Sequence, residues 1–264
     1  MSNRAAVTLA VVAVAVGLAV SGCRFEVNVG SLQITDDASV PGPVNAIQLA
    51  AGDGDIKVHT APGSGVAIHR TIHYHGKTKP QPGQQVTNGV LTFVKGCSNC
   101  SVDYDLTAPS SARVQIRNGS GSIRVADVAT ADIQAGSGDI TVWNVAGPVR
   151  AHTGSGSVRA ESVGGQTDLH ASSGDIIATG IQGGTLQADT GSGSIRLKFS
   201  GPPSSVRAVT GSGDVFIMLP DGEYRIDPST GSGDQHIGID SNPNAAATVF
   251  AKTGSGSIRI EPSD

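Results

Sequence analysis

The sequence predicts an all-β protein, a single-domain β-solenoid in which short coils stack like a parallel β-helix. A Gly/Ser phrase, TGSGSIRL in the copy at Thr190, recurs eight times from Asn118 onward, mostly at steps of about 17–20 residues. Self-similarity at such a period marks a repeat architecture. Apolar and polar residues alternate after most copies, as in a strand with one buried face. The chain has 36 glycines and only 3% aromatic residues, which suits a thin core of aliphatic side chains.

Residues 1–22 have the features of a lipoprotein signal peptide. Arg4 supplies a positive charge, and an apolar run follows from Ala5 to Val20. The run leads into Val-Ser-Gly-Cys, which resembles the lipobox of bacterial lipoproteins and implies that Cys23 is lipidated and becomes the first residue after cleavage. An ordinary secretory signal and an uncleaved anchor are the alternatives, and the run is short for the roughly 20 residues of a membrane span.

The rest of the chain is divided by composition. Residues 23–44 are interpreted as the lipidated cysteine and a tether, with a short strand-like run followed by a polar stretch that contains proline. The solenoid domain is expected over residues 45–264. Within it, residues 45–111 form a hairpin and lead-in region, and residues 112–264 form the regular repeats.

The lead-in region begins with an isolated Gly-rich turn, AGDGD, at Ala51. The loop 61–65 joins two alternating runs, IKVHT and VAIHRTIHYH, which predicts a β-hairpin. The polar stretch 76–85 is expected to be a loop. Two further strand-like runs, VLTFV and VDYDL, then flank a turn that carries Cys97 and Cys100.

Each regular coil is expected to contain two strands joined by two turns. Period-2 alternation places residues such as Ile123, Val125 and Ile140 on one inner side. Coils stacked about 4.8 Å apart would bury these side chains between two sheets. The turns need glycine because tight corners require positive φ and leave no room for a Cβ.

The residue between the inward positions of the first strand varies in a regular way. It is arginine in the copies that read GSGS and another residue in those that read SGD. Because like charges on adjacent strands repel, we expect an outer face on which the arginines form exposed ion pairs with the aspartates of intervening coils. The candidate binding face comprises Arg124, Asp139, Arg159, Asp175, Arg196 and Arg259.

The pair Cys97 and Cys100 has three interpretations. A small disulfide in an exported protein is the simplest. A metal site would need further ligands, and the candidates are His69, His73 and His75, which lie on one face of a predicted strand. A redox role resembles the thioredoxin motif, but that motif places its first cysteine at a helix N-terminus.

Other chemistries lack the residues that they need. The net charge is −4 and the 18 Lys and Arg residues are scattered, which argues against a nucleic-acid surface. The GSGD turns resemble part of a calcium-binding nonapeptide, but only half of the copies carry the aspartate. Short coils leave no room for the long loops that build solenoid active sites. We therefore expect no catalytic residue and no cofactor.

The order of a hairpin, the segment LTAPSSARVQIRNGSGSIRV at 106–125, and repeated TGSGDI-type and TGSGSI-type units resembles a bacterial putative-adhesin family of unknown function. The resemblance covers residues 45–260. It implies a β-solenoid exposed outside the cytoplasm, with no known catalytic residues, and many members are lipoproteins or membrane-anchored. It does not imply a particular ligand.

These observations lead to three functional hypotheses. The first is a non-enzymatic, lipid-anchored β-solenoid of the cell envelope with a structural, adhesive or binding role toward a surface glycan or an envelope protein. The second is an envelope-stress or regulatory accessory protein that binds a membrane partner. The third is a metal-binding module at the His/Cys hairpin. An outer-membrane location is favoured if the host has one, because Arg24 is not the acidic residue of an inner-membrane retention signal.

The sequence also raises the question of how the stack ends. The last strand, Ile258–Pro262, has no helix after it to cover an open sheet edge. End-to-end self-association is therefore one expectation.

Overall fold

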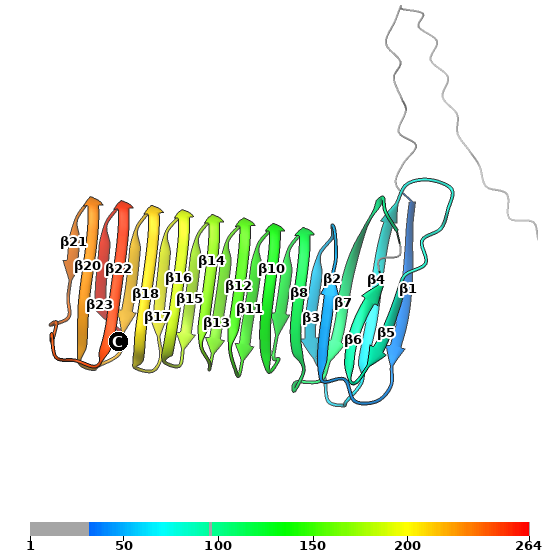
Figure 1. Ribbon diagram of the computed structural model, residues 1–264, viewed down its shortest axis with the longest axis horizontal. Helices are drawn as coiled ribbons and strands as arrows, with labels where there is room; N and C mark the ends of the chain where they lie inside the picture. The colour runs from blue at the N-terminus through cyan, green and yellow to red at the C-terminus, as the bar shows by residue number, and fades with distance from the viewer. Residues whose placement is uncertain (1–31, 95–96, 264) are drawn as a thin grey trace, which may run out of the picture. The chain divides into compact units, whose positions relative to one another are not determined.

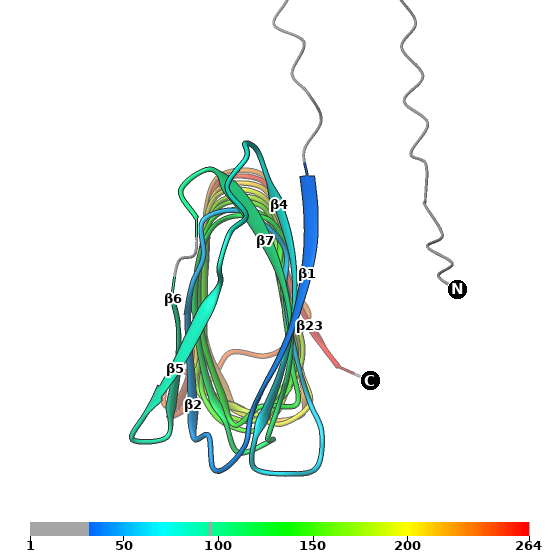
Figure 2. The same cartoon turned by 90° about the vertical axis from the view of Figure 1, so that its right-hand side faces the viewer.

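The computed structural model describes residues 32–94 and 97–263, and in this range it confirms the β-solenoid (Figure 1). Two sheets face each other, and viewed along the stack the coils superpose as a flattened tube (Figure 2). The described residues contain no helix that is long and apolar enough to cross a membrane.

We call the 12-stranded sheet sheet A. Its strands, in spatial order, are β1 (Leu32–Val40), β4 (Val66–Tyr74), β7 (Cys100–Ala108), β3 (Ile56–Thr60), β9 (Ile123–Ala126), β11 (Ile140–Val145), β13 (Val158–Val163), β15 (Ile176–Ile181), β17 (Ile195–Phe199), β19 (Val215–Leu219), β23 (Ile258–Pro262) and β21 (Gln235–Ile237).

The 11-stranded sheet is sheet B. Its strands, in the opposite spatial order, are β20 (Tyr224–Ser232), β22 (Ala247–Ser255), β18 (Pro203–Ser212), β16 (Gly184–Ser192), β14 (Thr167–Ser173), β12 (Val149–Ser155), β10 (Thr130–Ser137), β8 (Arg113–Ser120), β2 (Ala46–Ala50), β6 (Val90–Val94) and β5 (Gly83–Thr87).

The core consists of columns of aliphatic side chains that continue from coil to coil. Parallel pairing puts Ile140 beside Ile123 on one side and Val158 on the other, and all three are fully buried. Burying one such side chain contributes about 1.5–3 kcal/mol. Each coil adds only a few of them, so the fold depends on continuing the same register through the whole stack.

The corner glycines set this register. The second glycine of each GSG turn has positive φ, and Gly174, at φ +136°, lies against the carbonyl group of Gly156 in the preceding coil. A Cβ on Gly174 would overlap that carbonyl oxygen. The recurrent phrase is therefore a corner at which one backbone packs directly on the next.

The threonine before the GSG turn stabilises the same corner. Thr190 is buried, and its hydroxyl donates a hydrogen bond of 2.9 Å to the carbonyl oxygen of Gly174. Thr210 donates in the same way to Gly193. These hydroxyls satisfy corner carbonyls that the strand ladder leaves without a partner.

The final coil lies out of sequence order. Strand β23 is inserted between β19 and β21, and β22 is inserted between β18 and β20. The prediction that Ile258–Pro262 forms the open edge is therefore wrong. The edge strands at this end are β20 and β21, and the loop between β21 and β22 covers part of β20 through a hydrogen bond of 2.9 Å from the Asn242 N–H to the Tyr224 carbonyl.

This order makes aspartate and serine alternate at the corner through all the coils from Asp55 to Asp234. The Asp139 carboxylate accepts a hydrogen bond of 2.8 Å from the backbone N–H of Ser157 in the next coil. Asp214 accepts the same bond from Ser257, although Asp214 and Asp234 belong to consecutive copies in the sequence. The final coil thus separates two aspartates that would otherwise be neighbours.

The lead-in region differs from its sequence interpretation in three respects. Strands β3 and β4 do not pair as a hairpin, because β7 lies between them, parallel to β3 and antiparallel to β4. The polar part of the expected tether belongs to β1, which pairs with β4. The end of the expected loop 76–85 belongs to β5. In the last two cases pairing at the end of the stack recruits a segment whose local composition indicates a turn or loop.

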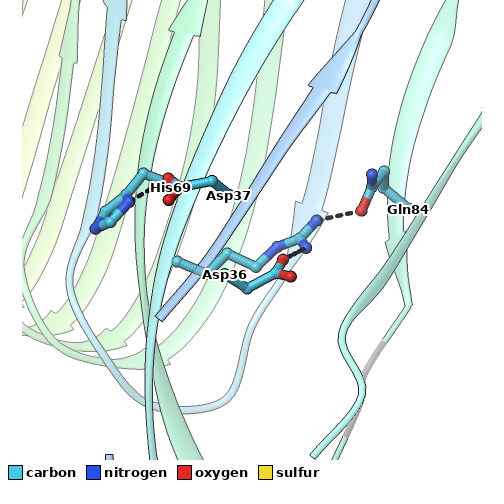
Figure 3. Close-up of polar contacts among 5 residues, drawn as sticks. Asp36, Asp37, His69 and Gln84 are labelled. Atoms are coloured by element: carbon cyan, nitrogen blue, oxygen red, sulfur yellow. Dashed lines mark hydrogen bonds and ion pairs between the residues drawn. The ribbon is translucent and has the colours of Figure 1, made fainter. Parts of the chain in front are cut away.

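A buried arginine joins the two sheets at this end. Arg70 occupies an inward position of β4 and is 1% exposed. Its guanidinium donates hydrogen bonds to Asp36 of β1 at 2.6 Å and to Gln84 of β5 at 2.5 Å (Figure 3). It also lies over the rings of Phe93 and Tyr104 at 5.5 and 6.0 Å. Burial raises the pKa of Tyr104 above its ordinary value, and the Arg70 charge partly offsets this rise.

Gly174→Ala is expected to destabilise the solenoid more than Gly63→Ala. The two glycines have nearly the same φ, +136° and +135°, but a Cβ on Gly63 meets no atom within 4 Å. The backbone strain common to both substitutions costs about 1–3 kcal/mol, and Gly174→Ala adds the overlap with Gly156. The midpoint of urea unfolding measures the difference. Equal shifts would show that the corner opens to admit a methyl group.

Asp36→Ala is expected to destabilise the lead-in region by about 2–3 kcal/mol, because it leaves the buried guanidinium without its carboxylate. Arg70→Met is expected to cost less, because it removes the charge and keeps the packing on the two rings. Hydrogen exchange of β4 amides compares the two variants.

Since the guanidinium lowers the pKa of Tyr104, Arg70→Met also moves the alkaline titration of this phenol to higher pH. A larger loss for Arg70→Met would contradict this account.

Candidate binding face on sheet A

One lateral row crosses the outer face of sheet A, with one residue from each coil. We call it the arginine row. Its members, in spatial order, are Lys57, Arg124, Thr141, Arg159, Ile177, Arg196, Phe216, Arg259 and His236.

The row contains five cations and no carboxylate. From Arg124 onward every second member is arginine, and the inserted final coil continues the alternation by placing Arg259 between Phe216 and His236. With strands about 4.8 Å apart, successive arginines are separated by about 9.6 Å. The guanidinium groups therefore form a regularly spaced line on a rigid sheet.

The expected ion pairs with the corner aspartates do not form. Asp139 and Asp175 each bind the backbone N–H of the serine in the next coil, at 2.8 Å. Arg124, Arg159 and Arg196 are exposed and have no ion pair within the part of the chain that the structure describes. Arg259 does have one, with Glu261 of its own strand at 2.8 Å. The carboxylates thus stabilise the corners, and three guanidinium groups are left facing solvent.

Apolar side chains lie between these arginines. Ile177 separates Arg159 from Arg196, and Phe216 separates Arg196 from Arg259; both apolar residues are half-buried. One position further along the same outer face lie Trp143 and Met218, also half-buried.

The sequence interpretation had selected the charged positions and missed the apolar ones. The signal was nevertheless present, because period-2 alternation assigns Trp143, Ile177, Phe216 and Met218 to the outer face. Arginine and large aromatic side chains together are typical of protein binding surfaces.

At the N-terminal end of the stack the row continues into a polar region. Asp37, His69 and Asp105 are register partners next to Lys57. His69 Nδ1 lies 2.6 Å from Asp37 Oδ1, and Lys57 Nζ lies 3.4 Å from Asp105 (Figure 3 shows the His69–Asp37 contact). A shallow cavity of about 510 Å³ opens here, lined also by His59 and Thr107.

The three candidate histidine ligands do not all converge. His69 contacts Asp37, whereas His73 Nε2 lies 3.3 Å from Asp103, and His73 and His75 together line a separate shallow cavity that includes Cys100. No group of three or more His, Cys, Asp or Glu residues within the described ranges is placed to hold a metal ion. The metal interpretation therefore has no preformed site there.

Cys97 and Cys100 are joined by a disulfide in the structure, with their Cα atoms 6.0 Å apart. The disulfide lies at the corner between β6 of sheet B and β7 of sheet A. It shares a small cavity with Ala50, Asp53 and Tyr104, so this corner covers the first Gly-rich turn. Its placement indicates a structural role at the lead-in end.

The opposite face offers a useful contrast. On sheet B the central arginines are paired, Arg150 with Asp168 at 3.3 Å and Arg207 with Asp189 at 3.8 Å. Arg207 also lies over the Phe250 ring at 5.1 Å. Arg113, Arg117 and Arg225, toward the two ends of sheet B, have no ion pair within the described residues, so the contrast with Arg124, Arg159 and Arg196 holds for the central arginines alone.

Comparison with known proteins supports the fold. No curated protein matches the chain. A crystal structure of a putative adhesin from Bacteroides fragilis superposes with a TM-score of 0.53 at 14% identity, over 87% of this chain and 97% of the other. A putative cell adhesion protein from Clostridium sporogenes, at 11% identity over 88% and 100% of the two chains, gives a TM-score of 0.34. A putative adhesin from Parabacteroides merdae, at 12% identity over 88% and 96%, gives 0.29.

At these identities the Bacteroides structure shows a shared fold alone. The family assignment comes from a second observation, in which the family model described as Toastrack DUF4097 matches residues 84–264. This range includes every regular coil and more than half of the chain. The resemblance inferred from the repeats is confirmed, and the chain belongs to the Toastrack DUF4097 family.

Proposed function

We propose that this chain is a non-enzymatic binding protein of the cell envelope with an adhesive role. In this proposal the solenoid presents the arginine row to a surface glycan or an envelope protein. The observation that carries the proposal is the alternation of Arg124, Arg159 and Arg196, which are exposed and unpaired within the described residues, with the half-buried side chains of Thr141, Ile177 and Phe216.

The rigidity of this face supports the proposal. Every member of the row lies on a strand whose position is set by pairing with its neighbours, so the side chains are positioned before a partner arrives. Preorganisation reduces the entropy that binding must overcome. The cavity of about 510 Å³ at the lead-in end of this face is shallow. An extended surface suits a partner that contacts several coils together.

The envelope location is proposed from the sequence. Cys23 lies outside the described residues, and its lipidation is inferred from the lipobox resemblance. A lipid at this position would attach the chain to a membrane outside the cytoplasm, in the outer membrane if the host has one. Stable anchoring needs at least two membrane signals, which the thiol-linked and amino-terminal acyl chains of a lipoprotein would supply.

A double substitution of the apolar residues, Ile177→Ser/Phe216→Ser, is expected to reduce partner retention at least about fivefold, because buried aromatic and aliphatic contacts carry much of the energy of an interface. Cells that express the full chain are incubated with labelled envelope polysaccharide and envelope protein fractions, and bound label is counted. The matched control is Val209→Ser/Phe250→Ser, which likewise replaces one β-branched aliphatic residue and one phenylalanine, on the outer face of sheet B. Equal retention by both variants, or no retention by the unaltered chain, would refute the proposal.

Cys23→Ser is expected to release the chain from membranes. Cells are labelled with a palmitate analogue and then fractionated, and the unaltered chain should carry the label and sediment with membranes. The variant should carry no label and remain in the supernatant. If the variant sediments as the unaltered chain does, the anchor is the apolar run and not a lipid.

A further inference from the structure

We propose that the arginine row binds a single chain of an anionic polysaccharide in which acidic groups recur once every two sugars. This inference rests on the proposed function and specifies its partner. It follows from the spacing of the cations, from what lies between them and from the charges on either side of the row.

The spacing is fixed by strand register. Arg124 and Arg159 are both register partners of Thr141, and Arg159 and Arg196 are both partners of Ile177. Each arginine is therefore two strands from the next, about 9.6 Å away. Two sugars of an extended β-linked chain span a similar length. A polymer with one acidic group in every disaccharide would place successive anions opposite successive arginines.

The intervening residues suit the intervening sugars. Thr141, Ile177 and Phe216 each lie between two cations and are half-buried. Pyranose rings have C–H faces that pack against apolar side chains, and the Phe216 ring offers such a surface. An anionic sugar over each arginine and a less polar ring face over each intervening residue would match the two-coil period of the protein.

The flanking charges restrict the partner to a narrow chain. The corner aspartates form one flank, two residues from the row and thus roughly 6.6 Å along the strand. On the other flank lie Glu161 and Glu261, each two strands away from Lys198. A single anionic strand lying on the row avoids these carboxylates, whereas a wide polyanion such as duplex DNA would contact them. The surface therefore selects by width as well as by charge.

The first experiment measures binding of the full chain, in detergent micelles, to immobilised polymers. Hyaluronate carries a carboxylate on every second sugar, and polygalacturonate carries one on every sugar. Poly(glycerol phosphate) tests phosphate as the source of charge, and dextran and duplex DNA serve as uncharged and wide controls. We expect hyaluronate to bind most tightly and its affinity to fall as salt rises. Equal or tighter binding of duplex DNA would overturn the width argument, and failure of every anionic polymer would overturn the inference.

The second experiment uses three multiple-substitution variants and the single variant Arg159→Gln. Arg124→Gln/Arg159→Gln/Arg196→Gln is expected to weaken hyaluronate binding at least about tenfold, since three exposed ion pairs are lost. Arg150→Gln/Arg207→Gln, on sheet B, should change affinity less than about twofold, since these residues already have partners. If both variants lose affinity for hyaluronate equally, binding depends on positive charge anywhere on the surface and not on the arginine row, which would contradict the inference.

The third variant tests spacing directly. Arg159→Gln/Thr141→Arg keeps the number of cations in the row and moves one of them by a single strand, about 4.8 Å. We expect it to bind hyaluronate as weakly as Arg159→Gln alone. If this double variant binds hyaluronate as tightly as the unaltered chain does, the two-strand spacing of the arginines does not determine affinity.

The inference and the proposed function can fail separately. If no anionic polymer binds but Ile177→Ser/Phe216→Ser still reduces retention of envelope material, the binding face stands and its partner is a neutral glycan or a protein. If neither result is obtained, both are wrong.

Discussion

The close contact between a corner glycine and the carbonyl group of the neighbouring coil is the constraint on which the rest of the structure depends. It allows no side chain at Gly174 or its equivalents and holds the coils in one register. Because every coil has the same register, residues at equivalent positions of successive coils form continuous rows. The aliphatic columns of the core, the buried threonine hydroxyls and the arginine row are all consequences of this one fixed register.

Polar pairing at the corner adds a second period of two coils. An aspartate carboxylate in one coil accepts the serine N–H of the next, and Asp and Ser coils alternate from Asp55 to Asp234. The arginines of the row all occur in Ser coils, so they recur with the same period of two coils. The spacing of the charges on the outer face thus coincides with the hydrogen-bonding pattern of the corners, and this spacing is the property that the proposed partner would recognise.

Much of this arrangement could be predicted from the sequence, and the failures have identifiable causes. The glycine corners, inward positions and arginine offsets follow from period and alternation. The partner of Asp139 could not be predicted, because the donor is a backbone N–H in another coil and residue types do not indicate which backbone group a carboxylate contacts. The hairpin of β3 and β4 was wrong because a local turn signal does not show that β7 separates them. Arg70, by contrast, could have been found, since alternation puts it inward with Ile68 and Ile72.

The inserted final coil has a consequence for how the protein is made. Domains generally begin to fold from their N-terminal side as the chain emerges, and the coils from β8 to β19 can add to the stack in that order. Residues 224–237 cannot, because the strands that they pair with, β22 and β23, lie later in the chain. This segment must wait for residues 247–262 to emerge and dock first. Completion of the stack is thereby coupled to the emergence of β22 and β23, and a chain interrupted before residue 247 would leave two adjacent coils unformed.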